Sequence, residues 1–257
     1  MIRIAAVGDL HYDSHSAGRL SRYLSMIDRH ADLFLIAGDL TQVGSIEEAR
    51  CLADDLSEVK IPIFAVFGNH DYHSNLQKNL VDVFSQARIS ILEGNGATLN
   101  VRGTKVGIVG LKGFGGGFVG ACGSDFGEHE MKSFVRTTKD CADVLKSQLQ
   151  NLDCEIRIAL THYSPIEGTL LGEKKEIYPF LGSYLLAEAI DQGRADIAIH
   201  GHAHHGIEKG MTPGGIPVRN VALPVITSAY NIYTLLKDQF NSQFSSLPDS
   251  IRTTALN

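Results

Sequence analysis

Residues 195–205 read Ala-Asp-Ile-Ala-Ile-His-Gly-His-Ala-His-His, an apolar run followed by four histidines within six positions. The run is typical of a buried strand, and neutral imidazole is the side chain that metal ions bind most often. In an extended segment, side chains two positions apart point to the same side, so His202 and His204 are expected to share one site. Expression tags and solvated turns are also rich in histidine, and the rest of the chain decides between these interpretations.

An apolar run followed by glycine and a polar residue occurs three times in the first ninety residues: Ile4–Val7 before Gly8-Asp9, Leu33–Ala37 before Gly38-Asp39, and Ile63–Phe67 before Gly68-Asn69-His70. Short apolar runs that contain β-branched residues are typical of strands buried on both faces. Helical patterns lie between them: over residues 17–30, from Ser45 with Glu48 three residues on, and from Ser74 with Gln77 three residues on. The last two have the spacing of a capping box. This alternation predicts an α/β fold with parallel strands.

The pattern changes after residue 99. Residues 99–109 predict a hairpin that turns at Arg102-Gly103, which adds antiparallel pairing and a second sheet. Helices are predicted over about 139–152 and 184–192, and strands over 156–161, 196–200, 216–221 and 232–236. The glycine-rich stretch 113–120 lacks the spacing of a dinucleotide-binding loop and is interpreted as a pliable loop, either a lid over substrate or a plain connector. We predict one domain over residues 1–240 and a polar tail over residues 241–257.

The composition narrows the class of protein. With 257 residues, 44% of them hydrophobic, the chain can bury a sizeable core. Its net charge of −6 argues against a broad contact with nucleic acid or an anionic membrane, while leaving room for a local basic patch. The four cysteines have no metal-binding or disulfide spacing and are expected to be reduced and mostly buried. No apolar run approaches the roughly 18 residues of a membrane span, so we expect a cytoplasmic protein.

Parallel strands end at the same edge of a sheet, so the polar residues that follow the predicted strands are expected to gather at that edge. In open α/β sheets, ligands bind outside these carboxyl ends of the strands. Seven of these residues are candidate metal ligands: Asp9, His11, Asp39, Asn69, His162, His202 and His204. Each has an ordinary structural explanation when taken alone, such as a helix cap, a turn or a core histidine. Their joint occurrence favours a site.

The chemistry of the seven donors indicates what they would hold. All are nitrogen or oxygen donors, which suits manganese, iron or zinc, and two divalent ions better than one. Asp39 lies between the other blocks in the sequence and is the expected bridge between the ions. Two dications, two carboxylates and a bridging hydroxide leave a net charge of about +1, which attracts an anionic substrate. The predicted site therefore suits hydrolysis of a phosphoester.

The blocks resemble, in order, those of the calcineurin-like metallophosphoesterases: Asp9-Leu-His11, Gly38-Asp39, Gly68-Asn69-His70-Asp71, His162 and Gly201-His202-Ala203-His204. The resemblance spans about residues 9–204 and implies a four-layer α-β-β-α sandwich of two mixed sheets flanked by helices. It implies that Asp9, His11, Asp39 and His204 hold one ion, and that Asp39, Asn69, His162 and His202 hold the other. His70 would contact the phosphate and protonate the leaving oxygen as a general acid, with Asp71 orienting it. Such an acid typically contributes about 10²–10⁴-fold in rate.

Departures from the family pattern concern the substrate. Phosphoprotein phosphatases of this superfamily carry an arginine just before the Gly-Asn-His block and another soon after Gly-Asp, whereas this chain has Phe67 and no arginine over residues 38–44. The bidentate grip on a monoester dianion is therefore missing, which favours a small nucleotide-like or other organic phosphodiester. Lys112 and His73 are candidates for further phosphate contacts, or ordinary loop residues. The alternatives are a nuclease with the same centre and a non-catalytic metal-binding scaffold. No sequence pattern points to an oligomeric state.

Overall fold

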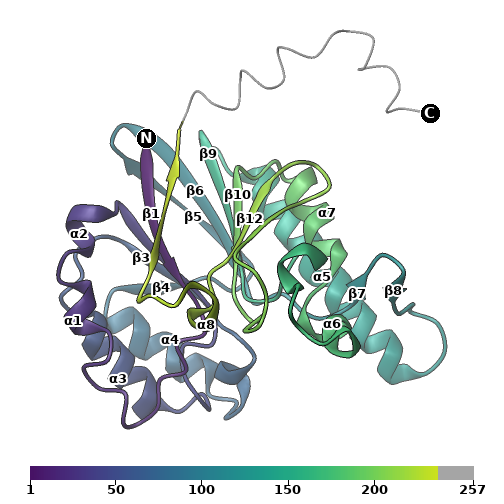
Figure 1. Cartoon of the computed structure of the whole chain (residues 1–257), viewed down its shortest axis with the longest axis horizontal. Helices are drawn as coiled ribbons and strands as arrows, with labels where there is room; N and C mark the ends of the chain where they lie inside the picture. The colour runs from purple at the N-terminus through teal and green to yellow at the C-terminus, as the bar shows by residue number, and fades with distance from the viewer. Residues whose placement is uncertain (237–257) are drawn as a thin grey trace, which may run out of the picture.

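The computed structural model describes residues 1–236, in which two β-sheets pack face to face between two layers of helices (Figure 1). The first sheet has the strand order β13-β1-β2-β3-β4, and the second has the order β11-β12-β10-β9-β6-β5. Both sheets are mixed, because β13, β5 and β11 pair antiparallel with their neighbours while the other pairs are parallel. The predicted four-layer fold is confirmed. The predicted tail over residues 241–257 lies outside the described residues.

The strands and helices are numbered in the order in which they occur along the chain. The strands are β1 (Ile2–Val7), β2 (Leu33–Ala37), β3 (Ile63–Val66), β4 (Ile89–Ile91), β5 (Asn95–Val101), β6 (Thr104–Leu111), β7 (Gly117–Phe118), β8 (Ala121–Cys122), β9 (Ile156–Thr161), β10 (Ile197–His200), β11 (Lys209–Met211), β12 (Pro217–Asn220) and β13 (Asn231–Leu235). The helices are α1 (Ser21–Leu24), α2 (Ile27–His30), α3 (Ile46–Leu56), α4 (Gln77–Gln86), α5 (His129–Asn151), α6 (Tyr178–Leu181), α7 (Tyr184–Gln192) and α8 (Leu223–Ile226), with short 3₁₀ turns η1 (His70–Tyr72), η2 (Glu167–Leu170) and η3 (Lys175–Ile177).

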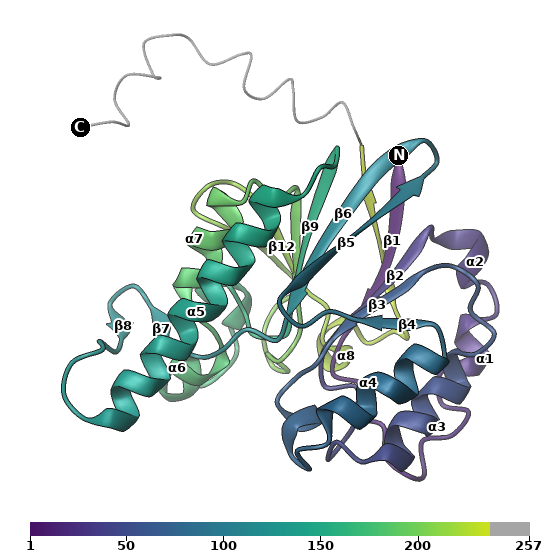
Figure 2. The same ribbon diagram turned by 180° about the vertical axis from the view of Figure 1, so that it is seen from behind.

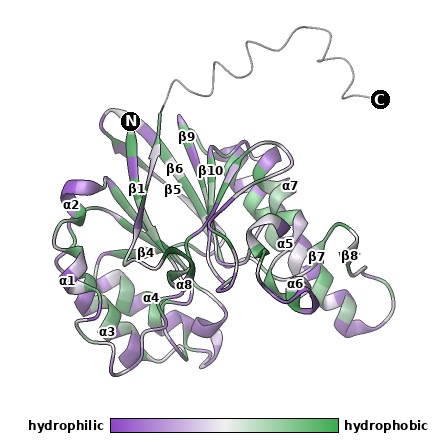
Figure 3. Cartoon of the chain, viewed as in Figure 1, coloured by the Kyte–Doolittle hydropathy of each residue, from purple (hydrophilic) through white to green (hydrophobic). Residues whose placement is uncertain are grey.

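The two faces of each sheet bury different cores, because successive side chains of a strand point to opposite sides. In β1, Ile4 packs into the core between the sheets, whereas Ala5 packs against the helices of the first half. Helix α5 covers the outer face of the second sheet, and α3 and α4 cover that of the first (Figure 2). Hydrophobic residues concentrate on the strands and on the helix surfaces beside them (Figure 3). The parallel strands are therefore buried on both faces, as their apolar runs predict.

Local sequence signals account for several boundaries. The hairpin between β5 and β6 turns at Arg102 and Gly103, both with positive φ (51° and 81°), as the primed hairpin turns require. At the start of α3, the side chain of Ser45 accepts a hydrogen bond from the Glu48 amide, and the Glu48 carboxylate accepts one from the Ser45 amide. The predicted hairpin and this predicted capping box are confirmed.

Other local predictions are wrong. Ser74 caps no helix, because its hydroxyl donates to the Val43 carbonyl, and α4 begins only at Gln77. The pattern over residues 17–30 is divided into α1 and α2. Helix α5 begins ten residues before the predicted start at 139, since Val135 and Thr138 continue its buried face. Part of the glycine-rich stretch 113–120 pairs with the residues after it, as the small hairpin of β7 and β8.

The cysteines and the helix lengths bear on two further expectations. All four thiols are free, with Cys122 exposed and the other three half-buried, so the prediction that most are buried is wrong. Within residues 1–236, no helix combines the length and the apolar composition needed to traverse a bilayer.

Candidate metal centre

Loops at the carboxyl ends of five parallel strands bring the candidate ligands together. In the first sheet, Asp9 and His11 follow β1, Asp39 follows β2, and Asn69 follows β3. In the second sheet, His162 follows β9, and the loop after β10 carries His202 and His204. The chain therefore assembles all seven candidate donors from both sheets at one edge of the sandwich, as the strand order predicts.

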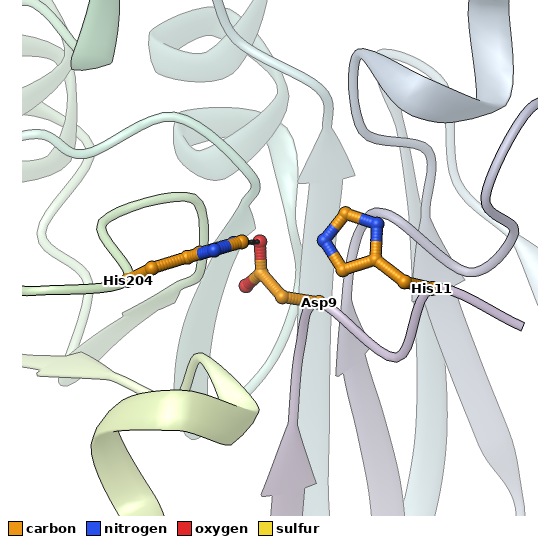
Figure 4. Close-up of side chains that lie close together, drawn as sticks. All are labelled: Asp9, His11 and His204. Atoms are coloured by element: carbon orange, nitrogen blue, oxygen red, sulfur yellow. Dashed lines mark hydrogen bonds and ion pairs between the residues drawn. The ribbon is translucent and has the colours of Figure 1, made fainter.

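One group of donors consists of Asp9, His11 and His204, whose ligand atoms all lie within 4.8 Å of one another (Figure 4). His204 Nε2 lies 2.9 Å from Asp9 Oδ1, although the two residues are 195 positions apart in the chain. Asp9 is 2% exposed. Burial opposes ionisation of its carboxyl, but the hydrogen bond from His204 and the charge of His162 outweigh burial and lower the pKa of Asp9. Asp9 is therefore an anion that faces two imidazoles.

A second group consists of Asp39, His162 and His202, with ligand atoms again within 4.8 Å of one another. The side chain of Asn69 joins it, because its Oδ1 lies 3.0 Å from His162 Nε2. Asp39 is 1% exposed and lies between the two groups: its Oδ2 is 3.7 Å from His11 Nε2, and its Oδ1 is 3.5 Å from His162 Nε2. One carboxylate thus offers an oxygen to each group.

The hydrogen bonding and the pKa values of the candidate ligands are those expected of residues that bind divalent ions. Both ring nitrogens of His11 are buried and have no hydrogen-bond partner among the described residues, which is rare for buried polar atoms. Burial lowers the pKa of His11, and burial together with the neighbouring His162 lowers the pKa of His202 to about 3. Metal ions bind neutral imidazole, so these rings have the protonation state that a ligand needs. The residues present therefore suit a metal centre.

Backbone carbonyls orient two of the rings. His162 Nδ1 lies 2.9 Å from the Ala37 carbonyl oxygen, and His202 Nε2 lies 3.2 Å from the Phe180 carbonyl oxygen. A ligating histidine usually donates its second N–H to such an acceptor, which fixes the tautomer. The opposite nitrogen of each ring is then free to bind an ion. These acceptors could not be predicted from the sequence, because every residue has a main-chain carbonyl.

Four candidate ligands have a backbone conformation that L-residues rarely adopt. The φ angles are positive at Asp9 (57°), His11 (45°), Asp39 (48°) and His202 (69°). Hydrogen bonds hold the loops in this form: the Asp9 amide donates to the Gly38 carbonyl, and the His11 amide donates to the Asp39 carbonyl, each at 2.9 Å. Strained conformations of this kind cluster at functional sites.

Glycines make room for the ligands of neighbouring loops. A Cβ atom on Gly68 would overlap the carboxylate of Asp39, and one on Gly201 would overlap that of Asp9. A Cβ atom on Gly38 would likewise overlap the His162 ring. The glycines next to the candidate ligands are therefore needed for the close approach of the loops.

Substituting Gly68 with alanine tests this packing. Gly68 does not have a positive φ, so alanine suits its backbone and the effect is steric. We expect at least about tenfold weaker metal binding and a lower Tm, because such overpacking costs about 1–3 kcal/mol. Equilibrium dialysis against Mn²⁺ measures the first effect. Gly168→Ala is the control, since its Cβ would meet nothing closer than 3.7 Å; equal metal affinity in both variants would contradict the steric explanation.

His70 forms a third group of close donors with His11 and Asp39, with ligand atoms within 4.8 Å of one another, but Asp71 does not orient His70. The His70 ring packs edge-on against His11 with centroids 4.5 Å apart, and its Nδ1 lies 2.8 Å from the Gln42 carbonyl oxygen. The buried carboxylate of Asp71 instead accepts hydrogen bonds from the amides of Leu40, Thr41 and Gly68 and from the Thr41 hydroxyl. The expectation that Asp71 orients His70 is therefore wrong. Burial and the nearby Asp39 raise the pKa of Asp71 to about 6, and its role is to join the two loops.

The loop after β10 is not an extended strand, because residues 204 and 205 form a turn and residue 206 a bend. The alternation of side chains along a strand therefore does not apply here, but His202 and His204 both lie at the centre, in different groups of donors. His200, the neighbour of this loop, is fully buried and bonds to the Thr169 hydroxyl and the Gly201 carbonyl. Burial lowers the pKa of His200 to about 4, and the residue is part of the core.

Comparisons with known proteins bear on the chain as a whole. A sequence profile described as calcineurin-like phosphoesterase matches residues 2–206. Two similar proteins are each described as a probable cyclic nucleotide phosphodiesterase. The one from Vesicomyosocius okutanii subsp. Calyptogena okutanii (strain HA) is 33% identical over 101 residues, which are 35% of this chain and 43% of that protein. The one from Ruthia magnifica subsp. Calyptogena magnifica is 35% identical over 74 residues, which are 27% of this chain and 32% of that protein. The matches thus span less than half of either relative.

Solved structures show the same fold at low sequence identity. The crystal structure of phosphopantetheinyl hydrolase from Mycobacterium tuberculosis superposes with a TM-score of 0.59 at 14% identity, covering 86% of this chain and 89% of that chain. At this identity the likeness concerns the fold alone.

Proposed function

The chain belongs to the calcineurin-like phosphoesterase family, and on that premise we propose that it is a metal-dependent phosphodiesterase that hydrolyses a small organic or nucleotide-like phosphodiester. The observation that carries the proposal is the position of Asp39, whose two oxygens face donors from both sheets. A centre built in this way suits two cations that share one carboxylate.

In this proposal the seven donors divide into two sets that share Asp39. Asp9, His11, Asp39 and His204 would hold one ion, and Asp39, Asn69, His162 and His202 the other. When bound, manganese, iron or zinc ions polarise a phosphate and lower the pKa of water. The remaining positive charge favours an anionic substrate in a protein whose net charge is −6.

His70 would supply the proton for the leaving oxygen. The Gln42 carbonyl accepts a hydrogen bond from Nδ1, so the proton that a protonated His70 ring can transfer is the one on Nε2. Contact with His11 places this ring beside the candidate ligands. An alkoxide is a poor leaving group, and donation of a proton at the leaving oxygen removes this barrier.

Two observations support a diester over a monoester. Phe67 occupies the position before the Gly-Asn-His block, and no arginine lies over residues 38–44, so a bidentate grip on a doubly charged phosphate is missing there. The two similar proteins described as probable cyclic nucleotide phosphodiesterases agree with this choice.

The test uses the full chain stripped of metal with a chelator and reloaded with Mn²⁺. We expect two bound ions per chain by elemental analysis and hydrolysis that depends on reloading. Bis(p-nitrophenyl) phosphate should be cleaved with a higher kcat/KM than p-nitrophenyl phosphate, and cyclic nucleotides and short single-stranded DNA complete the panel. Faster cleavage of the monoester would contradict the diester assignment, and faster cleavage of DNA would favour a nuclease. Two bound ions without hydrolysis of any ester would favour a metal-binding scaffold.

A further inference from the structure

An open pocket of about 410 Å³ lies beside the metal centre and contains none of the seven candidate ligands. It is formed by η1, by the loop after β6 and by the middle of α5, and its walls include Tyr72, Glu93, Lys112, Phe114, Cys141 and Val144. Most of the surface that the lining residues expose to the pocket is apolar, although Glu93, Lys112 and Asp140 also line it. The pocket is therefore suited to an organic group and not to a bare inorganic ion.

Tyr163 lies between Lys112, which lines this pocket, and His202 of the metal centre, because its ring is close to both. The Tyr163 ring packs against His202 with centroids 4.4 Å apart, and Lys112 Nζ lies 5.1 Å from the Tyr163 centroid. The Lys112 carbonyl also accepts a hydrogen bond from the His162 amide, at 3.0 Å. A molecule held at the metal centre would thus lie one side chain away from the pocket.

The Lys112 ammonium has unused hydrogen-bonding capacity. Besides Tyr163 it faces the rings of Tyr72 and Phe114, each with its centroid 5.0 Å from Nζ. Aromatic faces attract a cation but accept no strong hydrogen bond, and the one hydrogen bond of Nζ is a long contact of 3.4 Å to the Gly113 carbonyl. Within residues 1–236, no carboxylate oxygen lies within 4.0 Å of it. Two of its three donors therefore have no protein acceptor among the described residues and are available to a ligand.

Glu93 holds Tyr72 in place and leaves Lys112 available. Its Oε2 accepts a hydrogen bond of 2.6 Å from the Tyr72 hydroxyl, and its Oε1 accepts one of 3.3 Å from the Phe67 amide. Tyr72 is two residues after His70, so this contact also connects the pocket wall to the loop of the proposed general acid. The carboxylate fixes an aromatic wall at the mouth of the pocket.

We propose that this pocket binds the aromatic or heterocyclic substituent of the phosphodiester and that Lys112 donates a hydrogen bond to a phosphate oxygen of the same substrate. The proposal rests on the proposed function and narrows its substrate class. A single ammonium matches the single negative charge of a diester, whereas the arginine pairs of monoester enzymes match a dianion. The ring of the substituent would lie against Phe114, Tyr72 and Val144.

Substitution of Lys112 tests the phosphate contact. We expect Lys112→Met to lower kcat/KM for bis(p-nitrophenyl) phosphate by about 10–100-fold, the usual range for loss of one charged hydrogen bond. Lys112→Arg should recover part of this loss, and both variants should keep two bound ions and the Tm of the unmodified protein. The control is Lys105→Met near the start of β6, the strand that Lys112 follows, where Lys105 pairs with Asp153 at 2.6 Å on the surface. Its activity should be unchanged.

Filling the pocket with a larger side chain tests, by ligand binding alone, whether the pocket holds an organic group. Val144 is 40% exposed at the pocket wall, and Val81 on α4 is 37% exposed and lies away from it. With the Mn²⁺-loaded protein, calorimetry should show that Val144→Trp raises the Kd of phenylphosphonate by about tenfold, as expected for loss of a buried ring contact. The Kd of inorganic phosphate should not change in this variant, and Val81→Trp should change neither value. Lys112→Met should weaken both ligands.

The outcomes separate this proposal from the proposed function. A protein that binds two ions but hydrolyses no ester refutes the proposed function, and the phenylphosphonate measurements still decide whether the pocket binds an organic group. A protein that is active, but in which Lys112→Met behaves as Lys105→Met and Val144→Trp as Val81→Trp, refutes the pocket proposal and leaves the function intact.

Discussion

Replacing Asp39 with asparagine is expected to remove bound metal and hydrolysis together. Asp39 is 1% exposed, and its two oxygens lie 3.7 Å and 3.5 Å from the Nε2 atoms of His11 and His162. An amide keeps the shape of the side chain but has one oxygen and no charge. Loss of one partner from a buried charged cluster costs about 3–5 kcal/mol, so metal affinity should fall by roughly 10²–10³-fold or more.

Elemental analysis and turnover of bis(p-nitrophenyl) phosphate measure the two effects on one sample. Asp196→Asn is the matched control, because Asp196 is a half-buried carboxylate at the amino end of β10 that accepts a hydrogen bond from the Arg157 amide. That variant should keep both ions. Full metal occupancy with normal turnover in Asp39→Asn would show that this residue does not bridge the ions.

Replacing His70 with asparagine is expected to separate catalysis from metal binding. His70 is proposed to donate a proton and not to ligate an ion, so the variant should keep two ions. Its rate on esters with poor leaving groups, such as alkyl esters, should fall by about 10²–10⁴-fold, the usual contribution of a general acid. The p-nitrophenolate ion leaves without a proton, so aryl esters should be slowed much less.

The comparison of leaving groups is the decisive measurement for His70. His30→Asn, at the exposed end of α2, is the control and should match the unmodified protein on every ester. Equal slowing of alkyl and aryl esters would exclude a role in protonation. Loss of one ion from His70→Asn would instead make this residue a ligand.

Much of the fold was predictable because its determinants are local. The apolar runs before Gly8, Gly38 and Gly68 have the length and composition of strands buried on both faces, which predicts a parallel sheet covered on both sides. The hairpin over residues 99–109 indicated a second sheet, and the resemblance to the family implied that the two sheets form a sandwich between helices. The convergence of polar residues after these strands also follows, since parallel strands end at the same edge. The start of α5 was missed because exposed polar residues surround Val135 and Thr138.

The contacts between loops could not be predicted from the sequence. Asp71 is adjacent to His70 in the chain, but adjacency does not determine which groups a buried carboxylate faces, and the three amides and one hydroxyl that it satisfies come mainly from the loop after β2. The same holds for the carbonyl acceptors of Ala37, Gln42 and Phe180. The resemblance to the family indicated the identity of the candidate ligands, and only the folded chain shows what holds them in place.

The positive φ angles at four candidate ligands affect how the centre would take up metal ions; these ligands are Asp9, His11, Asp39 and His202. The hydrogen-bonded ends of the strands impose these conformations on the folded protein, so the donors are preset before a cation arrives. We therefore expect the slow step of loading to be the dehydration of the incoming ion and not a rearrangement of the chain. Magnesium, which gives up its water reluctantly, would enter more slowly than larger dications, and kinetics as well as affinity would select the resident metal.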